Sequence, residues 1–310
     1  MLIPAGGLKV IPVIFYEDPE EQKGSLRLRI FRNLLLGWAM FISVSGVVLI
    51  SLLILFPPGE AIYKSIFDDG CDGGEKQATD IAIGDAKLIR IAGDRGDLLV
   101  EGQNGRTSVT VLGQTCATLA SHRHIDSITF HALNSGDEIV ISVDIPRRAN
   151  GELESDVRMD LQIFVPDGFP RVEIENEDGP VSVSNVHSVQ ANVGFGSLDV
   201  KDIGGSVNVT GLEGSMALAD IDGNVAVGSI HGYGEVDLTS IRGNVSIGDN
   251  RSGPARISDI GGDVDIGNAG TGHLTVHRVA GDVAVNANVR GQILMHEIQG
   301  NVSLPREPGA

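Results

Sequence analysis

Carboxylate side chains recur at one position of a repeated sequence unit, where they could act as acids and bases. Asp202 and Asp220 take this position in adjacent units, and Asp259 takes it further along. Glycoside hydrolysis needs two carboxyl groups at a fixed separation, and sugar sites usually add a stacking aromatic. The units carry only Phe195 and Tyr233 as aromatics. We therefore expect a solvated face here, no catalytic residue, and no enzyme.

Histidines could bind a metal ion in two places. His122 and His124 would share one face of a strand, whereas His277 and His296 take the same outward position in consecutive units. Either pair would lie close enough to share an ion. The sequence places no third or fourth ligand beside them, so it predicts no metal site.

Glycine followed by Asn or Asp marks one corner of each unit and invites a calcium interpretation. Calcium-binding β-helices carry the pattern Gly-Gly-x-Gly-x-Asp, which this sequence lacks. Only Asp263 and Asp282 are charged at the corner, so turn formation explains it better. Nucleotide-binding and nucleophile-elbow motifs are also absent, and we predict no cofactor.

The repeated unit is about nineteen residues long and occurs seven times between Gly179 and Pro305. Self-similarity at such a period is typical of a solenoid, in which each unit buries its apolar face against the next. The sequence thus predicts an all-β fold with a parallel β-solenoid over residues 179–305.

Two short strands account for each unit. The first carries apolar residues in the pattern Φ-x-Φ-x-x-Φ, as in Val181, Val183 and Val186, and the second follows at once, as in Val189 and Ala191. Alternation with β-branched residues favours strands over helices. The corner between the two strands runs from Gly205-Ser206 to Gly300-Asn301. We expect positive φ at its glycines, local backbone bonds from Asn and Asp, and an Asn ladder.

Ahead of the repeat, residues 79–178 show strand patterns of lower regularity, which predicts an irregular β-rich cap or irregular first coils. An open terminal coil exposes unpaired strand edges, so a cover is expected. Residues 57–78 would form a linker and residues 306–310 a tail.

Residues 34–56 carry no charge and predict one transmembrane helix of about 35 Å. A cleaved signal peptide is the alternative, but residues 1–33 precede the apolar run, and no small-residue cleavage site follows. Arg27, Arg29 and Arg32 lie just before the span. The positive-inside rule then places residues 1–33 in the cytoplasm as a head, and the C-terminal part outside the cytoplasmic membrane.

Cys71 and Cys116 are the only cysteines, and both follow the predicted span. An even number of cysteines in an oxidising compartment favours a disulfide between them. Two separate buried thiols are the alternative.

The net charge is −18. Phosphate contacts need a basic face, so we expect no nucleic-acid partner. A charged partner is expected to be cationic.

Three motifs together resemble a known family. They are the segment Ala86–Val100, the strand that ends in Val165-Pro-Asp-Gly168, and the Gly-Asn/Asp-Val-x-Val coils. After a membrane span, this order is similar to the bacterial adhesin-like β-solenoid domains of unknown function, over about residues 80–304. The resemblance implies a bacterial envelope protein. The head of residues 1–33 departs from the family pattern.

The sequence as a whole predicts a single-pass membrane-anchored envelope protein with a non-enzymatic solenoid. This solenoid would be a binding, adhesin-like or structural module, with an envelope protein or polysaccharide as partner. An alternative is a transmembrane regulator that couples an envelope signal to a cytoplasmic partner through residues 1–33. A third hypothesis is self-assembly of the solenoid, coil end to coil end, into filaments. A polysaccharide-active β-helix enzyme is the least favoured of these hypotheses.

Overall fold

The computed structural model describes residues 75–117, 128–145, 157–250, 253–287 and 291–305. The chain divides into two compact units, Met1–Asp68 and Asp69–Ala310, and all described residues belong to the second. The predicted head, membrane span and tail lie outside the described residues, as does most of the predicted linker. Within the described part, no helix is long and apolar enough to span a bilayer.

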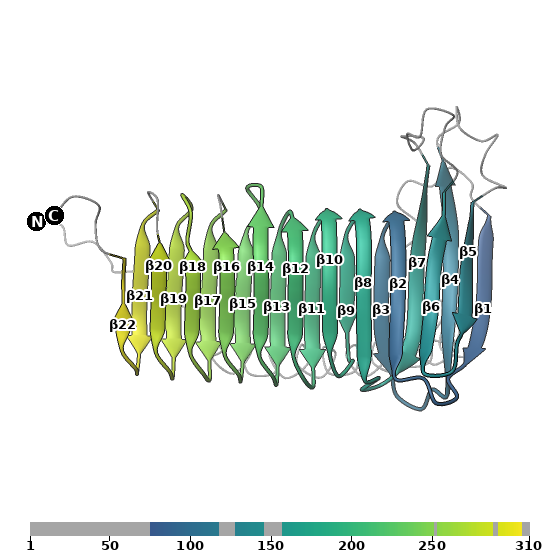
Figure 1. Ribbon diagram of the computed structural model, residues 1–310, viewed down its shortest axis with the longest axis horizontal. Helices are drawn as coiled ribbons and strands as arrows, with labels where there is room; N and C mark the ends of the chain where they lie inside the picture. The colour runs from purple at the N-terminus through teal and green to yellow at the C-terminus, as the bar shows by residue number, and fades with distance from the viewer. Residues whose placement is uncertain (1–74, 118–127, 146–156, 251–252, 288–290, 306–310) are drawn as a thin grey trace, which may run out of the picture. The chain divides into compact units, whose positions relative to one another are not determined.

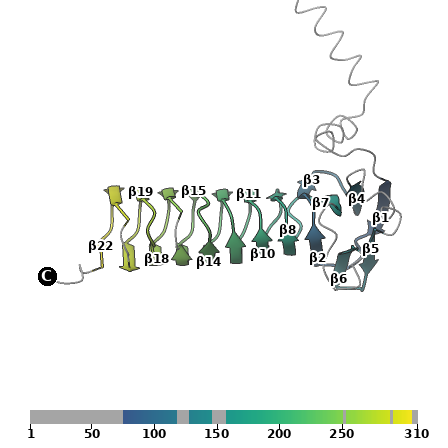
Figure 2. The same cartoon turned by 90° about the horizontal axis from the view of Figure 1, so that it is seen from above.

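Strands of the second unit form two sheets of eleven strands each, which lie face to face as two layers (Figure 2). In spatial order, sheet A contains β1 (Lys76–Ala82), β4 (Ser108–Ala117), β7 (Val157–Pro166), β3 (Leu98–Gln103), β9 (Val181–Ser184), β11 (Leu198–Ile203), β13 (Met216–Ile221), β15 (Val236–Ile241), β17 (Ala255–Ile260), β19 (Leu274–Val279) and β21 (Ile293–Ile298). Sheet B contains β22 (Val302–Ser303), β20 (Val283–Ala287), β18 (Val264–Asn268), β16 (Val245–Asn250), β14 (Val225–His231), β12 (Val207–Glu213), β10 (Val189–Phe195), β8 (Arg171–Asp178), β2 (Leu88–Arg95), β6 (Glu138–Asp144) and β5 (Thr129–Asn134).

From β8 onward the chain alternates between the sheets, so each coil contributes one strand to each layer (Figure 1). Each strand pairs in parallel with its equivalent in the next coil. Val245 pairs with Val264, and Val264 pairs with Val283. This register confirms the predicted parallel solenoid with coils of about 19 residues. The apolar positions of the repeat fill a continuous core between the sheets, because period-two alternation turns them all to one face.

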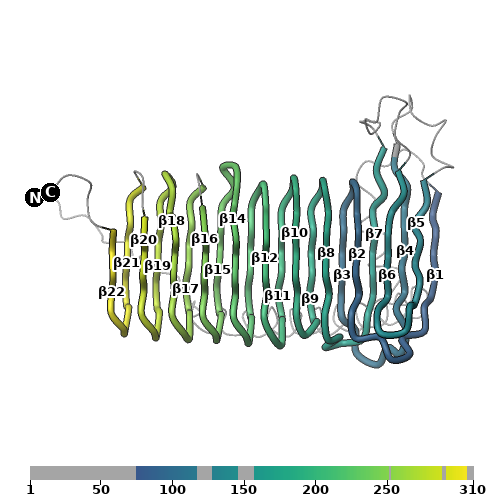
Figure 3. The backbone as a smooth tube through the Cα atoms, viewed as in Figure 1, coloured from purple at the N-terminus to yellow at the C-terminus, as the bar shows by residue number. Residues whose placement is uncertain are grey.

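The N-terminal region combines parallel coils with an antiparallel edge. The coil β2–β3 pairs with β8 and β9 on one side, and with β6 and β7 on the other. The chain thus leaves the stack after β3 and returns to a place beside the coil already formed (Figure 3). Beyond that coil, β4 pairs antiparallel with β7 and β1, and β5 with β6. Mixed pairing of this kind covers the first coils.

At the other end of the stack, the last coil has no neighbour among the described residues. Ile293, Met295 and Ile298 are only partly buried, although their equivalents in earlier coils belong to the core. Val302 and Leu304 are about half exposed. The repeat keeps its apolar pattern up to this end, where no further coil covers it in the described part of the chain.

Candidate binding groove

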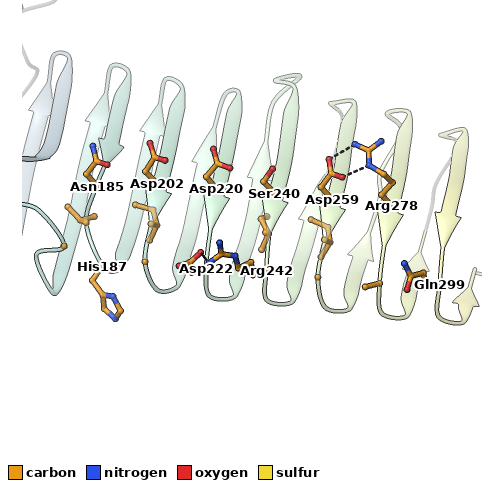
Figure 4. Close-up of a pocket in the computed structure, with 18 of the residues that line it drawn as sticks. Asn185, His187, Asp202, Asp220, Asp222, Ser240, Arg242, Asp259, Arg278 and Gln299 are labelled. Atoms are coloured by element: carbon orange, nitrogen blue, oxygen red, sulfur yellow. Dashed lines mark hydrogen bonds and ion pairs between the residues drawn. The ribbon is translucent and has the colours of Figure 1, made fainter.

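A groove of about 1200 Å³ follows the edge where each strand of sheet A turns into sheet B. This edge is the lower one in Figure 1. Two rows of residues line the groove, and Figure 4 shows them along successive coils. The first row is Asn185, Asp202, Asp220, Ser240, Asp259, Arg278 and Glu297. The second row is His187, Gly204, Asp222, Arg242, Gly261, Ala280 and Gln299.

Every residue of the first row has a left-handed backbone conformation, with φ between 53° and 58°. The strand register shows the reason, because it passes from the pair Lys201–Ala219 to the pair Ile203–Ile221. Asp202 and Asp220, the residues between these pairs, both have the left-handed conformation, which leaves them outside and returns Ile203 and Ile221 to the core. The sequence contains a signal for this conformation in the spacing of three residues between the last two apolar positions of Φ-x-Φ-x-x-Φ. Strict alternation would have turned the last apolar residue outward.

Two ion pairs link neighbouring coils, one in the middle of the groove and one in its C-terminal half. Arg278 donates to both carboxylate oxygens of Asp259, with its Nη2 2.6 Å from Oδ2. This hydrogen bond lowers the pKa of Asp259 below its ordinary value and raises the pKa of Arg278. In the second row, Nη1 of Arg242 lies 2.5 Å from Oδ1 of Asp222. Both arginines are thus neutralised by an acid of the preceding coil.

The N-terminal half of the groove is acidic. Asp167, Asp202 and Asp220 line it, and no ion pair joins them to a cation in the described part of the chain. Over the whole lining there are six carboxylates, including Asp222, Asp259 and Glu297, against two arginines, which is four acids in excess. The groove therefore attracts positively charged groups at its N-terminal half.

The corner glycines beneath the groove differ from the prediction. Gly223, Gly243 and Gly262 do not have positive φ, so that expectation is wrong. They are needed because the coils approach closely. A Cβ on Gly243 would lie 2.4 Å from the carbonyl oxygen of Gly223 and 2.5 Å from Oδ1 of Asn224.

Asn and Asp side chains at this corner bond to the next coil rather than to their own turn. The backbone N–H of Asn244 donates to Oδ1 of Asn224 at 2.8 Å, and the N–H of Asp263 donates to Oδ1 of Asn244 at 2.8 Å. The same bond continues from Asp282 to Asp263 and from Asn301 to Asp282. An inter-coil ladder thus exists, in which each link joins a side chain to the main chain. These oxygens are used in the ladder, which agrees with a structural role for the corner.

The residues considered for chemistry are divided between the two edges. Asp202 and Asp220 meet in the groove, as their positions predicted. Phe195 and Tyr233 are exposed at the opposite edge, where sheet B turns into sheet A. The described lining of the groove contains no Phe, Tyr or Trp, so sugar stacking against the acids has no aromatic partner there.

Other candidates fall outside the groove or outside the described residues. His277 and His296 are register partners in β19 and β21, whereas His122 and His124 lie outside the described residues. Cys116 is buried beside Asp160, with its Sγ 3.3 Å from Oδ2. Cys71 lies outside the described residues, so its disulfide with Cys116 stays a prediction. Sequence reasoning missed the second row of the groove, because those positions carry no repeated residue type.

Comparison with solved structures finds proteins from Bacteroides and Parabacteroides. One is from Bacteroides fragilis and is described as a candidate adhesin, with 13% sequence identity, a TM-score of 0.37, and coverage of 75% of this chain and 98% of that one. Another, from Parabacteroides distasonis, is described as a candidate lipid-binding protein, with 12% identity, a TM-score of 0.37, and coverage of 75% and 98%.

Sequence comparison gives a family but no curated relative. No curated protein matches the chain. The family model described as Toastrack DUF4097 matches residues 78–307, which includes both sheets and the whole groove.

Proposed function

This chain belongs to the Toastrack DUF4097 family, and we propose that its solenoid is a non-enzymatic binding module of the bacterial cell envelope. Its ligand is a cationic, extended segment of an envelope protein, which lies along the groove. The observation that carries this proposal is the acidic half of the groove, where Asp202 and Asp220 lie in adjacent coils and Asp167 lines the same end. All three are exposed, and none has an ion pair with a cation of the described residues.

The shape of the groove supports an extended ligand. Its lining reaches from Asn185 to Gln299, over seven successive coils, and coils in a parallel stack repeat at about 4.8 Å. A peptide in extended conformation rises 3.2–3.4 Å per residue, so side chains on one of its faces pass several coils. Lysine or arginine side chains of such a segment would meet carboxylates in the N-terminal half.

The same groove gives little support to catalysis. Glycoside hydrolysis uses one carboxyl group with a raised pKa as the acid, whereas the pKa of Asp259 is lowered by Arg278. Arg242 holds Asp222 in a second ion pair. These carboxylates serve as fixed charges that link coils, a role suited to binding.

Binding of a labelled decalysine peptide by the full chain in detergent tests the proposal. We expect the Asp202→Asn/Asp220→Asn double variant to bind more weakly, and added salt to weaken binding by the wild type. Asn tolerates the left-handed backbone of these positions, so the fold is kept. The matched control is Asp199→Asn/Asp237→Asn, which removes two charges from the outer face of sheet A. Equal losses in both variants, or equal binding of decaglutamate, would refute a specific acidic groove.

Incubation of the full chain with a panel of envelope and plant polysaccharides tests the non-enzymatic part of the proposal. We expect no release of reducing ends. Cleavage that disappears in the Asp202→Asn/Asp220→Asn variant would replace the binding function with an enzymatic one.

Residues 34–56 would anchor this module in the cytoplasmic membrane, with the groove on the outer side. Arg27, Arg29 and Arg32, which lie just before the span, support this orientation. Protease treatment of intact spheroplasts tests it, and we expect the solenoid to be accessible and residues 1–33 to be protected. Protection of the solenoid would contradict the proposed localisation.

A further inference from the structure

His277 and His296 lie next to each other on the outer face of sheet A. They are register partners in the adjacent strands β19 and β21, and their side chains point outward because Val276 and Val279 fill the core positions of β19. The ring centroids are 5.8 Å apart, with 75° between the ring planes. Rings at this separation can direct one nitrogen each toward a common point.

Glu297 brings a carboxylate to the same place. In a regular strand, the residue after His296 would point into the core. Glu297 instead has φ of 57°, which keeps it outside and turns Ile298 inward. Its Oε2 lies 3.2 Å from Nε2 of His277. Ligand atoms of His277, His296 and Glu297 all lie within 4.8 Å of one another.

We propose that His277, His296 and Glu297 bind a zinc ion through two imidazole nitrogens and one carboxylate oxygen. Zinc accepts these ligands at about 2.0–2.2 Å and often keeps one position for water beside three protein ligands. Imidazole nitrogens favour zinc over magnesium or calcium, which prefer oxygen. The present distances exceed those of a closed site, and rotation of the exposed side chains of His296 and Glu297 brings the three ligands together.

Arg278 competes with the metal for His277. Its Nη1 lies 2.6 Å from Nδ1 of His277, while Asp259 holds the other side of the guanidinium. A guanidinium can only donate, so Nδ1 accepts this bond and the ring proton is on Nε2, which faces Glu297. Zinc binds the lone pair of Nε2, so the proton moves to Nδ1 and the contact with Arg278 breaks. Loss of Arg278 should therefore tighten zinc binding.

Isothermal titration of the full chain in detergent, stripped with chelator and then titrated with Zn²⁺, tests the site. We expect one ion per chain. His296→Gln and Glu297→Gln should each weaken binding at least about tenfold, a loss that even outer partners of a metal site can cause. Arg278→Asn should tighten it, since Asn accepts the left-handed backbone. The control is His187→Gln, which removes an exposed histidine from another coil. Absorption of bound Co²⁺ gives a second readout, and circular dichroism checks that each variant is folded.

Three results would overturn the proposal. One is a wild-type chain that binds no zinc. Another is binding that survives His296→Gln but disappears in His122→Gln/His124→Gln, which would place the metal at the other histidine pair. The third is weaker binding in folded Arg278→Asn, which would make Arg278 part of the support of the site rather than a competitor.

Discussion

Seven residues of very different chemistry share one backbone conformation in the first row of the groove. Asn, Asp, Ser, Arg and Glu all occur there with φ near 55°. Such a conformation is strained for L-residues, and Asn and Asp tolerate it best. The left-handed backbone therefore disfavours β-branched residues in this row, whereas the charge and the length of the side chain can vary.

Replacement of Asp220 tests this selection. We expect Asp220→Ile to lower the free energy of unfolding by about 1–3 kcal/mol, because a β-branched residue is strained at positive φ. Asp220→Asn should be close to neutral. Urea denaturation of the full chain, followed by circular dichroism, measures both. The control is Asp199→Ile, at an outward strand position without positive φ, where isoleucine should be tolerated. An equal loss of free energy of unfolding in Asp220→Ile and Asp199→Ile would mean that exposing an isoleucine, and not the positive φ, causes the loss.

Asp160 gives the stability of the described unit a pH dependence. It is buried between strands, and burial raises the pKa of its carboxyl from the ordinary value of 3.8. Oδ1 accepts from the backbone N–H of Asp97 at 2.9 Å and lies 3.2 Å from Nε of Arg158. Sγ of Cys116 faces Oδ2. The lowering effect of the Arg158 charge is smaller than the effect of burial.

The folded state thus holds the Asp160 proton more tightly than the unfolded state does. This contribution to stability is fully present below pH 3.8 and is lost as the pH rises through the raised pKa. We expect the melting temperature of the wild type, measured relative to Asp160→Asn, to increase as the pH falls from 7 to 4. Asn can still accept from Asp97, which keeps the local structure. A difference in melting temperature between the wild type and Asp160→Asn that stays constant over this pH range would contradict the raised pKa of Asp160.

At the scale of elements, the corner glycines and the inter-coil ladder depend on each other. The side chain of each Asn or Asp passes beneath the glycine of the following coil to reach its main chain, so only a residue without Cβ fits there. We expect Gly243→Ala to cost about 1–3 kcal/mol, as overpacking in a tight site does. The control is Gly204→Ala, whose Cβ would meet only Nδ1 of His187, at 3.4 Å. Thermal melting of both variants gives the comparison, and equal stability would exclude the close approach as the reason for glycine.

The elements of the regular stack could be predicted from the sequence because burial in each coil repeats locally. Val245 and Ile247 alternate with exposed residues, and the same pattern in the next coil identifies the pairing partner. The insertion of the coil β2–β3, with β3 between β7 and β9 and β2 between β6 and β8, could not be predicted in this way. A strand such as β7, buried on both faces over most of its length, carries no alternation that specifies its neighbour.

The candidate groove was predictable only in part. Alignment of the repeat placed Asp202 beside Asp220, since equivalent positions stack. The groove itself depends on the left-handed residue of each coil and on the turn that follows, and no single residue type encodes either of them. The repeat pattern also placed Glu297 outside the core, but its contact with Nε2 of His277 depends on the left-handed backbone and the side-chain rotamers, which the sequence does not specify.

At the scale of the whole described unit, the stack ends differently on its two sides. Antiparallel strands cover the first coils, whereas β21 and β22 leave apolar side chains exposed. Val302 pairs with Val283, yet Val302 is 48% exposed and Val283 only 1%. Equivalent residues of the repeat are thus expected to contribute unequally to the free energy of unfolding.

Alanine substitution measures this inequality. We expect Val283→Ala to cost about 2 kcal/mol through lost burial and the resulting cavity. Val302→Ala should change stability by about 0.5 kcal/mol or less, as exposed substitutions do. Urea denaturation at several protein concentrations supplies both values. A cost for Val302→Ala that equals that of Val283→Ala and depends on concentration would mean that a second copy of the chain covers this end.

The hydrogen bonds between coils run along the stack, which has a mechanical consequence. Tension between the two ends of the stack pulls directly on these bonds, and the uncovered coil of β21 and β22 yields first. A released coil such as the one from Val264 to Val283 frees 19 residues, or up to about 65 Å of extended chain. The coils that remain keep their groove. Under load, the stack would lengthen one coil at a time, and a ligand bound as proposed would keep its contacts with the coils that remain.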